Sequence, residues 1–209
     1  MTERLRQRRP RRPFDRSLGV EKARRLFHQK GYDGVSVADL TKALDINPPS
    51  LYAAYGSKAG LYDQALRHYA DEKSLPASDI LDGHDLGEAI ATLLVSAAEQ
   101  YTRDPACRGC MVTEGRRAAD PGARAIAEEI GAGMIETIKR EISQRASHRG
   151  DVLADVVITL IQGLSAAAST GVSRMRLRAT AEQAGAMLKS ALDSSAIDYP
   201  PQTQLAKRC

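Results

Sequence analysis

Features of several protein classes are scarce or missing in this sequence. It has three cysteines, Cys107, Cys110 and Cys209, among 209 residues. They are poor material for a disulfide framework in what we expect to be a reducing compartment. No uninterrupted apolar run approaches the roughly 18 residues that a membrane span needs, and the start, MTERLRQRRPRRP, lacks the apolar stretch of a secretory signal. We therefore expect a cytoplasmic protein with no membrane partner.

Motifs that would indicate an enzyme are also missing. The sequence contains no GxGxxG or GxxxxGK[ST] phosphate loop, no GxSxG nucleophile elbow and no HExxH metal motif. Strand-like alternation is absent beyond a few residues, whereas helical periodicity runs through most of the chain. A hydrophobic content of 43% with 27% charged residues belongs to a soluble globular protein. We expect an all-α protein that is not an enzyme and uses no cofactor.

The stretch SVADLTKALDINPPSLYAAYGSK has the pattern of a helix-turn-helix. Ser36 can cap a helix over Val37–Leu44, whose apolar positions form one stripe. Asn47 can cap a second helix, because Pro48 suits its first position and no helix runs through two consecutive prolines. Gly56 ends this second helix. Two short helices joined in this way are what a DNA-reading motif requires.

The second short helix has two different faces. Leu51 and Tyr55 lie four residues apart and can face the protein body, which turns Ser50, Tyr52 and Ala53 outward. The outward face therefore offers small and hydroxylated side chains to a duplex.

Positive charge gathers in the amino-terminal third. Residues 1–75 carry 15 Lys and Arg against 9 Asp and Glu, a net of +6, whereas the rest of the chain has a net of −2. Seven of these arginines crowd the first sixteen residues, where Pro10 and Pro13 prevent a helix. We expect an arm that stays disordered until it meets phosphate. A solubilising tail is the alternative.

These residues resemble those of the TetR family of bacterial transcriptional regulators. The matching positions in the helix-turn-helix and just after it are Ser36, Leu40, Thr41, Asp45, Ile46, Ser50, Leu51, Tyr52, Tyr55, Ser57, Lys58 and Leu61. Upstream, Ala23, Leu26, Phe27, Gly31 and Tyr32 match the first helix of the family and its ending. The specific resemblance covers Phe14 to Tyr69, and beyond it rests on helical organisation and one short motif.

The resemblance implies a double-stranded DNA operator as partner. Ser36, Tyr52 and Lys58 are then phosphate anchors, and base contacts fall to the start and outer face of the second helix. A core tyrosine and a solvated lysine are the plainer interpretations of Tyr52 and Lys58. Arginines of the arm would lie in a minor groove. The full predicted set of DNA contacts is Arg9, Arg11, Arg12, Ser36, Asn47, Pro48, Pro49, Ser50, Tyr52, Ala53, Tyr55 and Lys58.

The rest of the chain is predicted to be helical. We expect helices near Ser57–Lys73, Leu86–Arg103, Gly109–Ala118, Pro121–Ala146, Asp151–Thr170 and Met175–Ser194, with a linker over Leu75–Asp85. The expected domains are a basic disordered arm (1–16), a helix-turn-helix DNA-binding domain with its linking helix (17–73), a helical ligand-binding and dimerisation domain (74–194) and a flexible tail (195–209).

The family implies two tasks for the second domain. The first is pairing into a homodimer through a four-helix bundle, with Leu160, Gly163, Leu164, Ala167, Leu177, Ala184 and Leu188 at the interface. The last two helices could instead close the core of a monomer. The second task is binding a small-molecule inducer that releases a repressor from a palindromic operator. Candidate lining residues are Leu93, Leu94, Met111, Met134, Ile138 and Ile161, although residues of this kind are more often plain core.

Cys107 and Cys110 form a C-x-x-C pair. Gly109-Cys110-Met111 resembles the start of a helix in one branch of the family, where the cysteine packs. Thiol sensing or soft-metal binding, such as copper(I), are alternatives, although the four histidines lie far apart in the sequence and supply no second ligand pair. A thiol- or metal-responsive helical sensor and an unrecognised helical enzyme therefore remain the competing functions.

Overall fold

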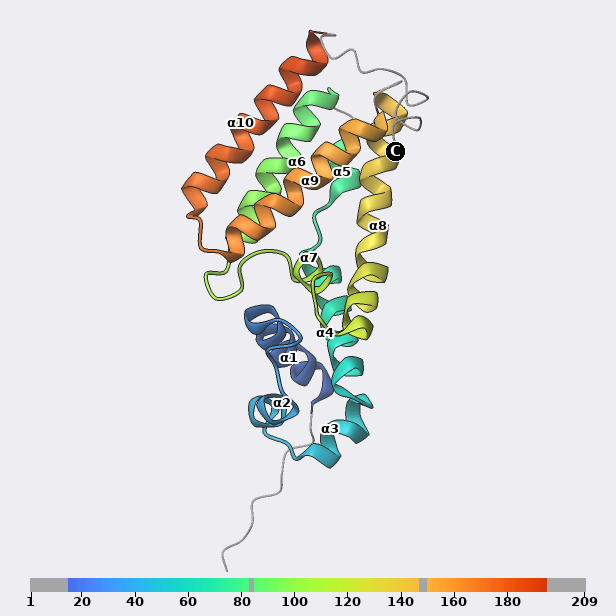
Figure 1. The fold of residues 1–209 in the computed structure, drawn as a ribbon, viewed down its shortest axis with the longest axis vertical. Helices are drawn as coiled ribbons and strands as arrows, with labels where there is room; N and C mark the ends of the chain where they lie inside the picture. The colour runs from blue at the N-terminus through green and yellow to red at the C-terminus, as the bar shows by residue number, and fades with distance from the viewer. Residues whose placement is uncertain (1–14, 83–84, 147–149, 195–209) are drawn as a thin grey trace, which may run out of the picture.

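The chain folds into helices throughout the part that the computed structural model describes, namely residues 15–82, 85–146 and 150–194. This confirms the predicted fold class. Figure 1 shows α1 to α3 at one end of an elongated molecule, α9 and α10 towards the other end, and α4 and α8 along one side. The predicted arm contacts Arg9, Arg11 and Arg12, the carboxy-terminal tail and Cys209 lie outside the described residues.

Four helices make up the amino-terminal part. They are α1 (Arg16–Lys30), α2 (Val37–Leu44), α3 (Pro48–Tyr55) and α4 (Lys58–Lys73). The bounds of α2, α3 and α4 agree with those that the capping residues predict. Arg16, expected in the arm, belongs to α1 because the side chain of Asp15 accepts from the N–H groups of Ser17 and Leu18 and starts the helix there.

Six further helices form the larger part. They are α5 (Ala77–Leu81), α6 (Leu86–Tyr101), α7 (Met111–Gly115), α8 (Pro121–Arg145), α9 (Gly150–Ser169) and α10 (Arg174–Asp193). Two predictions differ from this arrangement. The expected linker contains the short α5, and α7 covers only Met111–Gly115 of the predicted Gly109–Ala118. It begins two residues late because Gly109 has a φ of +81° and donates its N–H to the carbonyl of Tyr101.

The apolar helix α9 corrects one expectation. Contrary to the prediction that no segment is suited to a membrane span, its 20 residues are long and apolar enough by length and composition alone. In the structure α9 packs against α6 and α8, with Ala154, Val157 and Ile161 buried. One side of α9 is therefore the core helix of a bundle, while Val152 and Val156 on the other side are exposed.

The loop between α7 and α8 fastens the two parts of the molecule together. The Asp33 carboxylate, in the α1–α2 connection, accepts from the N–H groups of Ala119 (2.7 Å) and Asp120 (3.3 Å). Nearby, a Cβ added to Gly115 would lie 2.3 Å from the hydroxyl oxygen of Tyr62, so α7 and α4 are in close contact. A displacement of α7 or of this loop would therefore disturb these contacts with the α1–α2 connection and α4.

The contact between α6 and α10 requires a glycine. A Cβ added to Gly185 would lie 2.6 Å from the Cβ of Ala91 and 2.7 Å from its Cα. Because real Cβ contacts are longer, any side chain at this position forces the two helices apart.

We predict that Gly185→Ala destabilises the protein by about 1–3 kcal/mol, because overpacking outweighs the helix propensity of alanine. The free energy of unfolding in urea, at a fixed protein concentration, measures the effect. Gly133→Ala is the matched control, since Gly133 lies in α8 with nothing within 4 Å of an added Cβ. It should be neutral or slightly stabilising, and equal effects of the two changes would contradict the close contact.

Candidate nucleic-acid interface and cavity

The start of α2 is held by a capping box. The Ser36 Oγ accepts from the Asp39 N–H (3.0 Å), while the Ser36 N–H and hydroxyl both donate to the Asp39 carboxylate (2.9 and 2.6 Å). These two donors hold the pKa of Asp39 below its usual value. Because the Ser36 hydroxyl already donates to Asp39, the predicted phosphate contact at Ser36 would come from the backbone at this helix start. The first-turn N–H groups of α2, which have no intrahelical acceptor, are the donors that remain.

Local backbone conformation and capping also set the turn between α2 and α3 and the start of α3. Asp45 adopts a left-handed conformation with a φ of 55°, which ends α2. The side-chain oxygen of Asn47 accepts from the N–H of Ser50 (2.9 Å) and caps α3, and Pro48 occupies the first helical position. The short separation between the two helices is thus set by local hydrogen bonds.

The outer face of α3 is open. Pro48, Pro49, Ser50, Tyr52 and Ala53 are all exposed, and the Tyr52 side chain has half of its surface free. They lie at the end of the molecule opposite the outer ends of α9 and α10 (Figure 1).

Tyr55 is the member of the predicted DNA-binding set that the structure contradicts. Its side chain is buried beside Leu51, and its hydroxyl donates to the carbonyl of Arg16 at 3.0 Å. It holds α3 to α1 and is not available to a duplex.

Lys58 stands at the junction of α3 and α4. Its Nζ lies 3.9 Å from the centre of the Tyr32 ring, a cation–π contact that joins the start of α4 to the α1–α2 connection.

One group of side chains has metal-ligand chemistry. Ligand atoms of Glu21, His68 and Glu72 lie within 4.8 Å of one another. The Glu21 carboxylate is already bound by the buried guanidinium of Arg24, with both nitrogen–oxygen distances at 2.6 Å. The hydrogen bond from Arg24 lowers the pKa of Glu21. Since a metal ion would have to displace this pair, we interpret the group as an ion-pair network between α1 and α4.

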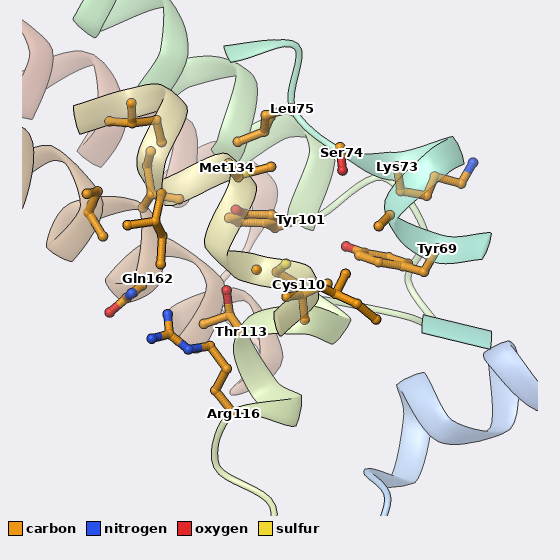
Figure 2. Close-up of a pocket in the computed structure, with 18 residues that line it drawn as sticks. Tyr69, Lys73, Ser74, Leu75, Tyr101, Cys110, Thr113, Arg116, Met134 and Gln162 are labelled. Carbon is orange, nitrogen blue, oxygen red and sulfur yellow. The ribbon is translucent and has the colours of Figure 1, made fainter. Parts of the chain in front are cut away.

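A cavity of about 120 Å³ lies among α4, α7, α8 and α9 (Figure 2). Of the predicted lining residues, Met134, Ile138 and Ile161 do line it. Leu93 and Leu94 do not, because both are completely buried in the bundle core, and Met111 is buried beside a different hollow.

Sequence analysis did not identify the polar residues of this cavity. Tyr69, Tyr101, Thr113, Arg116 and Gln162 all line it. In Figure 2 the two tyrosines approach Cys110, and the guanidinium of Arg116 points towards Gln162. A tyrosine in a helical apolar stripe and an arginine in a short helix carry no sequence signal for such a position.

Comparisons with known proteins decide the family. Residues 20–65 match the family model of bacterial regulatory proteins, tetR family. The HTH-type transcriptional repressor BdcR of Escherichia coli (strain K12) is 44% identical over 186 residues, which are 88% of this chain and 94% of that protein. This chain belongs to the TetR family. As a TetR-family member it is a DNA-binding transcriptional regulator and not an enzyme.

Two further similarities extend over most of this TetR-family chain. The HTH-type transcriptional repressor ComR of the same E. coli strain is 29% identical over 177 residues, 78% of this chain and 84% of that protein. The structure of a cysteine-substituted form of the TetR family transcriptional regulator CifR, complexed with 26 bp double-strand operator DNA, is 36% identical with a TM-score of 0.71. It covers 85% of this chain and 98% of the CifR chain.

The two cysteines of the C-x-x-C pair occupy different surroundings in this TetR-family protein. Cys110 lines the cavity, and its backbone N–H donates to the Ser165 hydroxyl at 2.9 Å. Cys107 is buried away from the cavity with its Sγ 4.0 Å from the Gln29 amide nitrogen, and burial raises the pKa of its thiol. Neither belongs to a group of three metal-ligating side chains among the described residues.

Two residues predicted at the dimer interface are core residues of one chain. Leu177 and Leu164 are 1% and 6% exposed, because α10 and α9 turn these positions onto α6. The remaining predicted positions, Leu160, Gly163, Ala167, Ala184 and Leu188, are partly or fully exposed. Sequence analysis also missed four exposed apolar side chains on the same two helices, Val152, Val156, Met175 and Met187.

Proposed function

We propose that this regulator is a cytoplasmic homodimeric repressor that binds a palindromic operator and is released when a small-molecule effector fills the cavity. The observation that carries the proposal is the open outer face of α3, presented at the end of the molecule away from the exposed apolar side chains of α9 and α10. Two copies joined through those helices present two DNA readers, each made of α1 to α3. Such a pair suits half-sites on successive turns of a duplex.

The proposed contacts divide into positioning and reading. The hydroxyl of Tyr52 and the ammonium of Lys58 bind phosphate, a role that sets register without reading sequence. The bases are contacted by the start and outer face of α3, namely by Asn47, Pro48, Pro49, Ser50 and Ala53. The carbon atoms of Pro48, Pro49 and Ala53 favour contact with thymine methyl groups. Arg9, Arg11 and Arg12 remain predicted minor-groove contacts. The net charge of +6 over residues 1–75 supports an electrostatic contribution to binding.

We predict that Tyr52→Phe and Lys58→Ala both weaken binding by a similar factor on every operator sequence, because both remove phosphate contacts. Lys58→Ala should also reduce the slope of log affinity against log salt by about 1. Footprinting across a salt series measures both effects.

Tyr55→Phe is the matched control for this test. It removes a buried hydroxyl bound to Arg16, so it should lower the free energy of unfolding by about 0.5–1.5 kcal/mol and leave the salt slope unchanged. A sequence-dependent loss for Lys58→Ala would show that it reads bases.

The proposed dimer interface lies on α9 and α10. Gly163 has nothing within 4 Å of an added Cβ, so a second helix can approach its surface closely. Met187 exposes 64% of its surface between the partly exposed Ala184 and Leu188. Apolar side chains gathered on one face of two helices favour burial against a second copy.

We predict that Met187→Glu converts the dimer to a monomer, because it places an unpaired charge in an apolar interface. Light scattering after size exclusion measures the mass, and operator affinity should fall with it. Gln144→Glu adds the same charge at an exposed position of α8 and should leave both unchanged. A dimeric Met187→Glu protein with full affinity would refute this interface.

The proposed release acts through α4. This helix begins beside the reader and carries Tyr69 in the cavity wall, so an occupant contacts the element that holds α1 and α3. A ligand that prefers the non-binding arrangement by about 1–3 kcal/mol weakens operator affinity roughly 5- to 150-fold.

A second candidate function is a response to thiol-reactive compounds. The observation that favours it is Cys110 in the cavity between two deeply buried phenols. Burial and the neighbouring sulfur raise the pKa of Tyr69 and Tyr101 well above the usual value, so both hydroxyls stay protonated as hydrogen-bond donors. An adduct oxygen at Cys110 would accept hydrogen bonds from them.

For this candidate we predict that iodoacetamide modifies Cys110 faster than Cys107, because only Cys110 lines the cavity. Peptide mass spectrometry of a Cys209→Ser protein measures the rates. Operator release should follow modification and be lost in Cys110→Ser but kept in Cys107→Ser. Release that persists in Cys110→Ser would exclude this function.

A further inference from the structure

The cavity has an unusual balance of charge. Two cationic residues, Lys73 and Arg116, belong to its lining, and no aspartate or glutamate does among the described residues. Figure 2 shows the amine of Lys73 directed away from Cys110, whereas the guanidinium of Arg116 points towards Gln162. The charge that faces the cavity interior is therefore positive.

Arg116 lies at the end of α7 and is half-buried. Its stem rests against α8, where a Cβ added to Gly131 would lie 3.9 Å from the Arg116 Cδ. Within the described part of the chain, no ion pair or side-chain hydrogen bond engages its guanidinium. The neighbouring Arg117 differs, because its Nη1 lies 4.0 Å from the Glu114 carboxylate.

Chemistry beside Arg116 suits a planar anion. Thr113 and Gln162 line the same cavity as Arg116, and in Figure 2 the guanidinium points towards Gln162. A guanidinium presents a rigid fork of donors that matches the two oxygens of a carboxylate, and a hydroxyl and an amide add further donors. A partly desolvated guanidinium with no acceptor gains from such an occupant.

Much of the remaining lining is apolar, and the volume limits the size of the occupant. Met134, Ile135, Ile138, Ile158 and Ile161 line the cavity. A cavity of about 120 Å³ is comparable to the apolar cavity of roughly 150 Å³ that binds benzene in another protein. One ring or a short chain therefore fills the space next to the guanidinium.

We propose that the cavity binds a small monocarboxylic acid, with its carboxylate on Arg116 and its apolar body against the isoleucines. The inference rests on the proposed function and names the class of its effector. Arg116 precedes the loop that Asp33 fastens to the reader. A carboxylate that binds to Arg116 therefore acts on that loop and, through the loop, on α1.

The test compares sodium benzoate with benzyl alcohol, which has a similar shape but no charge. Isothermal titration of the full-length protein should show benzoate binding at least about 10-fold more tightly, the range for a hydrogen bond to a charged group. Arg116→Gln should remove that advantage, whereas Arg116→Lys should keep part of it because it retains the charge without the fork.

Arg117→Gln is the matched control. Arg117 is the next residue in the chain, its side chain is 62% exposed, and it does not line this cavity. The variant should bind benzoate like the unaltered protein, and circular dichroism confirms that each variant is folded.

Three results would overturn the proposal. These are equal binding of benzoate and benzyl alcohol, undiminished benzoate binding by folded Arg116→Gln, and no binding of benzoate, butyrate or hexanoate at millimolar concentration. Operator affinity without ligand is measured in parallel, so that a failure of the DNA-binding proposal is recognised separately. Benzoate that binds through Arg116 without releasing the operator supports the carboxylate site and refutes only its role as effector site.

Discussion

Continuous packing along α4 is the constraint on which the rest of the molecule depends. Leu61, Tyr62 and Leu66 bury one stretch of the helix in the core that it shares with α1 and α3. One turn further, Tyr69 reaches the cavity wall. A single rigid helix thus carries side chains of both regions, and neither can shift its position along α4 without unpacking the other. The α7–α8 loop adds a second connection, so the reader is held at two points.

Helix bounds could be predicted from this sequence because the signals that set them are local. Ser36, Asn47 and Ser57 each cap the helix that follows, and the observed starts of α2, α3 and α4 agree with the prediction. The orientation of individual side chains was less accessible. For Tyr55 the four-residue spacing from Leu51 correctly predicted an inward side chain, and only its inclusion among the DNA contacts was wrong. Leu177 belonged to a stripe that covers both α6 and a surface, and a helical period alone does not say which neighbour a stripe meets.

The cavity could be predicted only in part. Met134, Ile138 and Ile161 followed from their apolar character, whereas Leu93 and Leu94 share that character and fill the core completely. What distinguishes the two sets is their helix, since Met134 and Ile138 lie on α8 and Ile161 on α9, whereas Leu93 and Leu94 lie on α6, and how these helices pack depends on contacts far apart in the sequence. Arg116 is the clearest case, since its position in the wall follows from the late start of α7 and from the Gly131 contact on α8.

The cap at the start of α3 limits how its capping residue, Asn47, can contact a base. Recognition of adenine by an asparagine uses both ends of the amide, one to accept and one to donate. In this protein the oxygen of Asn47 already accepts from the N–H of Ser50, which uses one of its two lone pairs and fixes the direction of the amide. In the proposed complex the amide of Asn47 therefore meets a base only in the orientation that the cap imposes, so the cap itself limits which base edges Asn47 can pair with through both ends of its amide.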